Sequence, residues 1–222
     1  MTTSLHLLYT FPDPESADDQ GLLAIGGDLS PERLLAAYSQ GIFPWFDNNY
    51  PILWWSPNPR LILLPEEFKL SRSLKKSLNK SYRVTFDQAF AEVIYNCATV
   101  NNRKNHTWIT DEMQQAYLAL HHLGYAHSVE IWDNNELIGG LYGISLGRAF
   151  FGESMFHQKQ DASKMALFYL CQQLRRWQFD FIDCQLPTPH LQSLGAISIN
   201  RQDFLKRLEK TLGYPTKQGI WQ

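Results

Sequence analysis

The stretch AHSVEIWDNNELIGGLYGISLGRAFFGESMF, residues 126–156, decides the fold. Its hydrophobic runs are interrupted twice, at Asp133-Asn134-Asn135 and at Leu146-Gly147-Arg148. Runs rich in β-branched and aromatic residues, separated by short turns that carry Asn, Asp or Gly, are typical of β-hairpins. The stretch therefore predicts an antiparallel meander.

A helix and a further strand are predicted after the meander. Asp161 can cap a helix that continues to about Trp177, and residues 179–186 have the composition of a buried strand. Meander, helix and returning strand follow one another in this order in the acetyltransferase-like fold. By this analogy we predict an α+β protein whose C-terminal domain is acetyltransferase-like (GNAT-like).

The first sixty residues predict a small N-terminal domain. Ser30-Pro31-Glu32 has the composition of a helix start, with a capping Ser and a Pro at the first helical position. The aromatic and proline-containing segments 43–46 and 54–60 predict an irregular aromatic loop, because proline disfavours regular structure. We expect a small N-terminal domain at residues 1–60 and the main domain at residues 61–222.

The charge of the chain is unevenly distributed. The formal net charge of the 222 residues is only −2, but residues 69–86 contain six bases and no acid. Within a helix predicted over residues 71–80, the leucines recur every four residues, and the bases do so nearly on the opposite face. Such a segment is either an ordinary solvated face or a local binding surface for a polyanion.

Several kinds of site are excluded or disfavoured. Cys97, Cys171 and Cys184 are odd in number and widely spaced, which disfavours a disulfide framework and a structural zinc site. Residues 1–9 lack the features of a signal peptide, and no later apolar run could span a membrane, so we expect a reduced, cytoplasmic protein. The chain has no GxxxxGK[ST], HExxH or GxSxG motif.

The usual cofactor turn of the acetyltransferase fold is also missing. An acyl-CoA enzyme of this fold needs a glycine-rich turn before the long helix, whose backbone amides would bind pyrophosphate. Residues 158–163 read QKQDAS and contain no glycine. We therefore expect no CoA and no metal.

Few polar residues lie on the predicted core strands. Asp183 and Gln185 are two apart, so both side chains are expected on one face of their strand, where burial without partners would be costly. They form either a satisfied structural pair or part of a reacting centre, and Glu153 could equally be a strand-end acid in water. The tryptophans, among them Trp45 and Trp108, are either core packing or a platform on which a nucleotide base stacks.

Eight segments match one family. They are GLLAIGGDLS (21–30), GIFPWF (41–46), ILWWSP (52–57), TWIT (107–110), HSVE (127–130), GESMF (152–156), ASK (162–164) and IDCQ (182–185). In these segments, which extend over about residues 11–204, the chain resembles the leucyl/phenylalanyl-tRNA–protein transferases. The resemblance implies an enzyme that transfers Leu or Phe, and less readily Met, from tRNA to proteins beginning with Arg or Lys. In bacteria this reaction marks the acceptor for degradation by the N-end rule. It also implies a monomeric protein.

The resemblance also implies roles for single residues. Trp45 and Trp108 would hold the terminal adenosine of the tRNA. Glu153 would bind the cationic acceptor N-terminus, and Asp183 with Gln185 would lie at the reacting centre. The pocket for the transferred side chain would be lined by Tyr117, Leu141, Phe150, Met155, Leu170 and Ile182. The tRNA backbone would contact Arg72, Lys75, Lys76, Lys80 and Arg83.

Two alternatives to this function stay open from the sequence. Leu141 and Leu170 stand where other members of the family carry Met and Phe, so the exact preference among Leu, Phe and Met is open as well. One alternative is a small-molecule N-acyltransferase of the same fold, although the missing pyrophosphate turn counts against it. The other is a tRNA- or peptide-binding module without catalytic activity.

Overall fold

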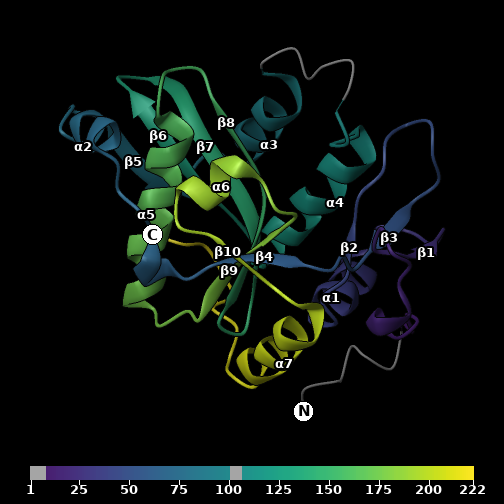
Figure 1. The fold of residues 1–222 in the computed structure, drawn as a ribbon. Coiled ribbons are helices and arrows are strands. Elements are labelled where there is room, and N and C mark those ends of the chain that lie inside the picture. The colour runs from purple at the N-terminus through teal and green to yellow at the C-terminus, as the bar shows by residue number, and fades with distance from the viewer. Residues whose placement is uncertain (1–8, 101–106) are drawn as a thin grey trace.

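The computed structural model describes residues 9–100 and 107–222, and the segment for which no signal peptide is predicted lies almost entirely outside them. One large sheet forms the centre of the molecule (Figure 1). Its seven strands are β4 (Arg60–Leu63), β5 (Arg83–Phe86), β6 (Ala126–Asp133), β7 (Glu136–Leu146), β8 (Ala149–His157), β9 (Phe181–Gln185) and β10 (Ile197–Ile199). They are ordered β10-β4-β9-β8-β7-β6-β5, and every neighbouring pair is antiparallel except β8 and β9.

The predicted meander is confirmed as β6, β7 and β8. The helix expected after it is α5 (Ala162–Arg176), and β9 then returns parallel to β8. A parallel pair needs a crossover connection, which α5 supplies. The predicted order of meander, helix and returning strand is therefore confirmed, and with it the mixed α+β fold class.

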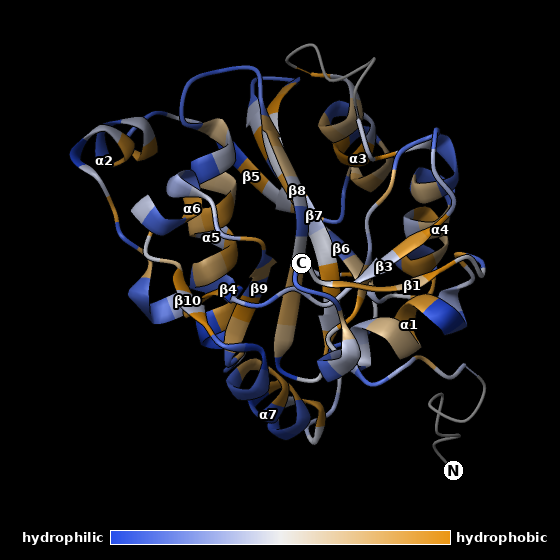
Figure 2. Ribbon diagram, turned by 45° about the vertical axis from the view of Figure 1, so that its right-hand side comes forward, coloured by the Kyte–Doolittle hydropathy of each residue, from blue (hydrophilic) through white to orange (hydrophobic). Residues whose placement is uncertain are grey.

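Helices cover both faces of this sheet and close two apolar cores. α5 packs on one face with α2 (Arg72–Leu78) beside it, and α1 (Pro31–Ser39), α3 (Phe90–Thr99) and α4 (Asp111–His122) cover the other. The strands between the two layers are largely hydrophobic, as their orange colour in Figure 2 shows. α5 can approach β7 closely because a Cβ on Gly139 would lie 2.4 Å from the Cβ of Ala162.

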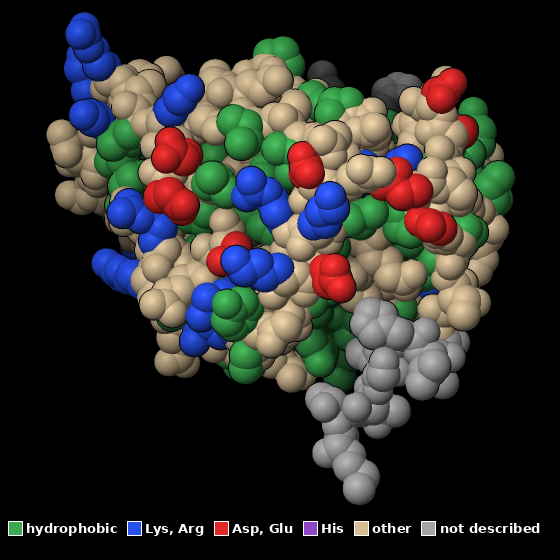
Figure 3. Space-filling view, turned by 60° about the horizontal axis from the view of Figure 1, so that its bottom comes forward, with side chains coloured by type: hydrophobic (Ala, Val, Ile, Leu, Met, Phe, Trp, Pro, Cys, Tyr) green, Lys and Arg blue, Asp and Glu red, His purple; other side chains and the backbone are tan. Residues whose placement is uncertain are grey.

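Three shorter helices and one longer one complete the described chain. They are η2 (Pro14–Ser16), η3 (Pro65–Glu67), α6 (Pro189–Ser193) and α7 (Arg201–Leu212). The face of the molecule around α7 carries interspersed acidic and basic side chains (Figure 3). In the part of the chain that the structure describes, no helix is both long and apolar enough to cross a lipid bilayer.

The prediction of an irregular aromatic loop in the N-terminal part is wrong. Its residues form a second sheet of three strands, β1 (Leu22–Ile25), β3 (Leu53–Trp55) and β2 (Phe43–Pro44), in that order. β2 is an edge strand of this sheet, and an edge tolerates a residue such as Pro44 that has no N–H to donate. The division into residues 1–60 and 61–222 stays a prediction.

The predicted helices are present, with one difference at a cap. Thr110 caps α4 by accepting a hydrogen bond from the backbone N–H of Met113, as the sequence predicts. Asp161 stands at the N-cap of α5 with a φ of 64°, but its side chain caps no backbone group. Its carboxylate instead accepts hydrogen bonds from Lys164 Nζ at 2.8 Å and from Ser77 Oγ at 3.1 Å.

Candidate functional site

An apolar pocket of about 130 Å³ opens between the meander, α5 and β9. Most of the side chains predicted for such a pocket line it, namely Leu141, Phe150, Met155, Leu170 and Ile182. Tyr117 does not line it. Leu167 and Leu191 do, although the sequence did not single them out; Leu167 shares a helix face with Leu170, and α6, which carries Leu191, was not predicted.

A second cavity of about 280 Å³ shares the mouth of the apolar pocket. Glu153, Gln185 and Leu191 line both cavities. Trp45 and Trp108 both line the second cavity, so the structure brings together two tryptophans that are far apart in the sequence. Trp45 is 40% exposed and meets Trp55 edge to face at 5.6 Å between ring centroids. Aromatic surface is thus available at the mouth of the pocket.

Glu153 is not a strand-end acid in water. Its carboxyl accepts hydrogen bonds from the hydroxyl of Tyr38 at 2.7 Å and from that of Tyr117 at 2.9 Å. The two tyrosines are themselves fully buried and hydrogen-bonded to each other through their hydroxyl groups. Tyr117 therefore belongs to the site behind Glu153 and not to the apolar pocket, and the sequence gave no indication of Tyr38, which lies on α1.

Protonation of Glu153 fits this triangle of groups. Burial raises the pKa of Glu153 to about 7, opposed by the two tyrosine hydrogen bonds, raised further by Asp183 and lowered by Arg60. Three contacts join the carboxyl and the two hydroxyls, but the hydroxyls hold only two protons. A protonated Glu153 supplies the third, so the neutral acid satisfies the triangle fully.

Asp183 is fully buried and paired with a residue that the sequence analysis missed. Arg60 on β4 donates from Nε to one carboxylate oxygen at 2.8 Å and from Nη2 to the other at 2.6 Å. Its guanidinium lies over the rings of Phe43 and Phe204, at 4.9 Å and 4.4 Å from their centroids. This bidentate pair supplies the partner that a buried carboxylate requires.

Gln185 is separated from Asp183 by the backbone. The φ of Gln185 is 55°, which is not extended backbone, and its N–H donates to Asp183 Oδ1 at 3.0 Å. The alternation of side chains along a regular strand therefore does not hold here: Gln185 lines both cavities and Asp183 lines neither. Among the described residues, the buried Nε2 of Gln185 has no hydrogen-bond partner. An unpartnered amide at a cavity mouth is available to a ligand.

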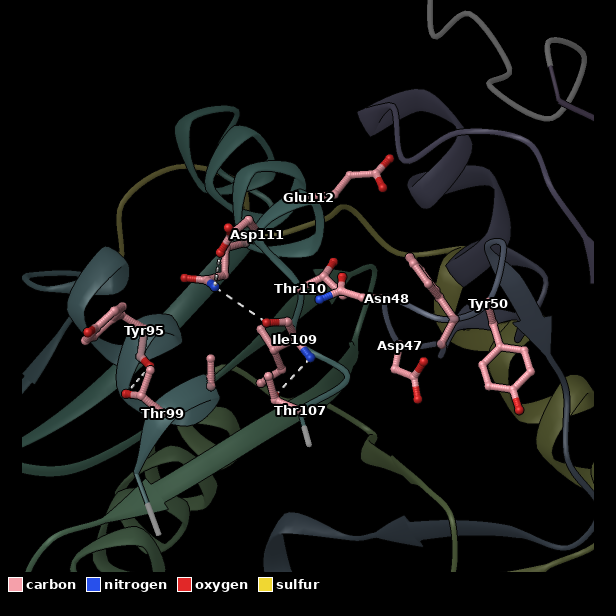
Figure 4. A pocket seen from close by; sticks show the side chains of 13 residues that line it. Asp47, Asn48, Tyr50, Tyr95, Thr99, Thr107, Ile109, Thr110, Asp111 and Glu112 are labelled. Atoms are coloured by element: carbon pink, nitrogen blue, oxygen red, sulfur yellow. Dashed lines mark hydrogen bonds between the residues drawn. The ribbon is translucent and has the colours of Figure 1, made fainter. Parts of the chain in front are cut away.

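The larger polar cavity of about 520 Å³ lies elsewhere (Figure 4). Its lining includes Asp47, Tyr50, Tyr95, Asp111 and Glu112, and none of the predicted site residues. Near the apolar pocket, burial raises the pKa of the Cys184 thiol, so this cysteine is not a thiolate at neutral pH. Over residues 9–100 and 107–222, no group of His, Cys, Asp and Glu is arranged to hold a metal ion.

The predicted tRNA-binding bases lie on and after α2. Leu74 is buried, whereas Arg72, Lys75, Lys76, Lys80 and Arg83 are all exposed. Ion pairs within the described chain involve none of these five bases. Ser77, on the same helix, contacts Asp161, which lines a further cavity of about 410 Å³. Met155 lines both this cavity and the apolar pocket, so the surface is continuous from α2 to the pocket.

An α+β fold whose apolar pocket opens on a carboxyl and an unpartnered amide defines a transferase that holds an apolar group. The sequence comparisons give the family. The model for leucyl/phenylalanyl-tRNA protein transferase matches residues 62–209, and that for the N-terminal domain of the same family matches residues 27–58. The chain belongs to the leucyl/phenylalanyl-tRNA protein transferase family.

Curated relatives that carry the name leucyl/phenylalanyl-tRNA–protein transferase match nearly the whole chain. One from Legionella pneumophila is 65% identical and covers 96% of each chain. One from Lawsonia intracellularis is 56% identical over 94% of this chain and 92% of its own. Solved structures are more distant: a conserved protein of unknown function from Staphylococcus epidermidis matches with a TM-score of 0.46 at 10% identity, covering 81% of this chain and 68% of its own.

Removal of Arg60 is expected to destabilise the fold strongly, because it leaves the carboxylate of Asp183 buried without a cation. We expect Arg60→Met to lower the free energy of unfolding by about 3–5 kcal/mol, measured by urea denaturation. The double variant Arg60→Met/Asp183→Leu should lose clearly less than the sum of the two single variants.

Arg33→Met is the matched control for this prediction. Arg33 pairs with Asp28 at 3.2 Å, but the two side chains are 23% and 55% exposed. Loss of such a surface pair should cost less than about 1 kcal/mol. Additive losses in the Arg60 and Asp183 variants would contradict the assignment of a coupled buried pair.

Proposed function

We propose that the protein transfers Leu or Phe, and less readily Met, from aminoacyl-tRNA to the N-terminal Arg or Lys of an acceptor protein. The observation that carries this proposal is the junction of the two cavities, where the unpartnered amide of Gln185 and the carboxyl of Glu153 lie side by side on one lining. One cavity is apolar and the other is flanked by tryptophans. The site can therefore receive two different groups on either side of one reacting centre.

The donor would occupy the apolar pocket and the aromatic mouth. The side chain of the transferred amino acid would lie against Phe150, Met155 and Ile182, and the terminal adenosine would stack on Trp45 and Trp108. An apolar pocket rejects charged and polar side chains, because they would lose their hydration there. It separates Leu, Phe and Met only weakly, because a difference of a few apolar atoms is worth little.

The acceptor would approach Glu153 from the mouth. A cationic N-terminus next to this carboxyl favours its ionised form and offsets the burial that raises its pKa. Tyr38 and Tyr117 would then both donate to the carboxylate and hold it in place. Glu153 is therefore proposed as the residue that selects a positively charged acceptor.

The reaction itself would be driven by the ester. The neutral α-amine attacks the carbonyl carbon, the bond from that carbon to the ribose oxygen breaks, and the ribose oxygen takes up the proton that the amine releases. A protein α-amine has a pKa of about 7.7–8.0, so a useful fraction is neutral near pH 7. The exchange of an ester for an amide is downhill and requires no ATP. Much of the catalysis would consist of positioning.

Gln185 would position the reacting groups. Its Oε1 could accept a hydrogen bond from the attacking amine, and its free Nε2 could donate to the oxygen on which negative charge develops. Asp183, held by Arg60, would act only through the backbone N–H of Gln185. An amide is too weak a base to carry the proton, so a ribose hydroxyl of the substrate is the proposed relay.

The body of the tRNA would lie along α2. Arg72, Lys75 and Lys76 present positive charge without acidic partners, and the surface continues past Asp161 to the apolar pocket. Lys80 and Arg83 would extend this basic surface beyond the helix. We further propose that the protein acts as a cytoplasmic monomer and marks its acceptors for degradation.

A transfer assay tests the function directly. Radiolabelled Leu-tRNA is mixed, without ATP, with a test protein that begins with Arg and, separately, with the same protein beginning with Ala. We expect label on the Arg protein alone. Label on neither, from folded protein that still binds tRNA, would favour a binding module without catalytic activity. Transfer of acetyl groups from acetyl-CoA would favour the small-molecule N-acyltransferase.

Charge reversal on α2 tests the tRNA surface. We expect Lys75→Glu/Lys76→Glu to weaken tRNA binding and to reduce the slope of log K against log salt by about 1–2, because each lost phosphate contact releases fewer counterions. Lys206→Glu/Lys210→Glu is the matched control, because it changes the net charge equally on the mixed-charge face of α7. Equal effects of the two double variants would place the tRNA elsewhere.

The pH dependence of the acceptor KM tests Glu153. Because its pKa is raised to about 7, Glu153 is neutral below that pH and ionised above it. We expect the KM for the Arg protein to fall as the pH rises from about 6 to about 8, and Glu153→Gln to have a high KM that does not follow this change. Titration of the α-amine affects both proteins alike. A parallel pH profile in the two proteins would remove Glu153 from acceptor binding.

A further inference from the structure

The last ten residues, 213–222, form a C-terminal segment that lies outside the part of the chain matched by the family model. It is fastened to the main domain at three points. Gly147 N donates to Thr216 Oγ1 at 2.9 Å, Gly219 N donates to the backbone oxygen of Gly124 at 3.0 Å, and Gln218 Nε2 donates to that of Leu123 at 2.8 Å. The segment thus has a defined course.

This course ends with a tryptophan inside the protein. Trp221 is 1% exposed, and its ring stacks on His127 at 3.8 Å between centroids, with 8° between the planes. Its backbone N–H donates to Asp87 Oδ2 at 2.7 Å, and its Nε1 donates to the backbone oxygen of Lys217 at 3.1 Å. Both ends of the residue are therefore held, and the indole has little freedom to move.

The indole meets the floor of the apolar pocket. The ring centroids of Trp221 and Phe150 lie 5.8 Å apart, and Phe150, which has no exposed surface of its own, lines the pocket. Gly143 confines the same ring, because a Cβ there would lie 2.6 Å from Phe150 Cε1. The ring of Phe150 is thus in contact with both Gly143 and Trp221, with the cavity as its remaining neighbour.

We propose that Trp221 sets the depth of the amino-acid pocket by holding Phe150 in place. The C-terminal segment is then a positioning element that determines which amino acid is transferred. This inference rests on the proposed function, in which the pocket receives the transferred side chain. Trp177 and Phe179, at 4.8 Å and 6.1 Å from the indole centroid, complete the aromatic surroundings that keep Trp221 there.

A smaller residue at position 221 would leave space behind Phe150. Protein interiors are close-packed, so the ring of Phe150 would relax into that space and the pocket would deepen. A deeper pocket favours the larger donor side chain. We expect Trp221→Ala to raise the ratio of kcat/KM for Phe-tRNA to that for Leu-tRNA by about three- to tenfold, the effect of a few apolar contacts.

Three further variants make this test specific. Trp221→Phe keeps an aromatic ring against Phe150 and should return the ratio close to that of the wild type. Trp221→Leu retains more volume than Ala and supplies the reading if Trp221→Ala does not fold. Ile94→Ala is the control for lost stability, because Ile94 is 1% exposed in the core on the opposite face and lines none of the cavities described above. It should leave the ratio unchanged.

The outcomes separate this inference from the proposed function. A raised ratio in Trp221→Ala or Trp221→Leu, restored in Trp221→Phe and absent in Ile94→Ala, supports the inference. An unchanged ratio in the Trp221 variants, with a lowered Tm like that of Ile94→Ala, would overturn it and leave the transferase intact. No transfer from either tRNA by the wild-type protein would overturn the proposed function and this inference together.

Discussion

The buried ion pair of Arg60 and Asp183 is the constraint on which the rest of the site depends. Arg60 lies on β4, directly after the small N-terminal sheet, and Asp183 lies on β9 in the middle of the large sheet. The guanidinium contacts Phe43 from the small sheet and Phe204 from α7. One side chain thus connects three parts of the fold. Hydrophobic replacement of a buried pair is often neutral for stability, so the value of this pair lies in the backbone of Gln185, which Asp183 holds in a non-extended conformation.

Sequence periodicity predicted the elements whose information is local. The meander, α2, α4 and α5 each have turns, caps or apolar stripes within a short window, and these are visible without a structure. β4 could not be predicted in this way, because its residues follow two prolines and its partners β9 and β10 lie more than a hundred residues further along the chain. The small sheet escaped prediction for the same reason. Pairing between distant segments is decided by the whole core, and a single sequence does not show it.

The candidate site shows the same division. The resemblance to a family pointed to Leu141, Phe150 and Ile182, and the structure brings them to one pocket. Arg60, Tyr38 and Trp221 act through contacts with residues far from them in the chain, and nothing in their own sequence surroundings separates them from ordinary core residues. A buried polar residue such as Asp183 implies that a partner exists, but only the structure identifies that partner as Arg60.

The titration behaviour of the site follows from what surrounds each group. Among the described residues that line the two joined cavities, those with titratable side chains are Tyr142, Glu153 and Cys184. Burial raises the pKa of Tyr142 and of Cys184 far above neutrality, so both stay protonated. Glu153 is the one whose pKa is brought near neutrality, and its two tyrosine partners can satisfy it in either form, by donating to the carboxylate or by sharing the proton of the acid. The site can therefore change charge at its mouth without rearrangement of its core, which is what the alternate arrival and departure of a cationic acceptor requires.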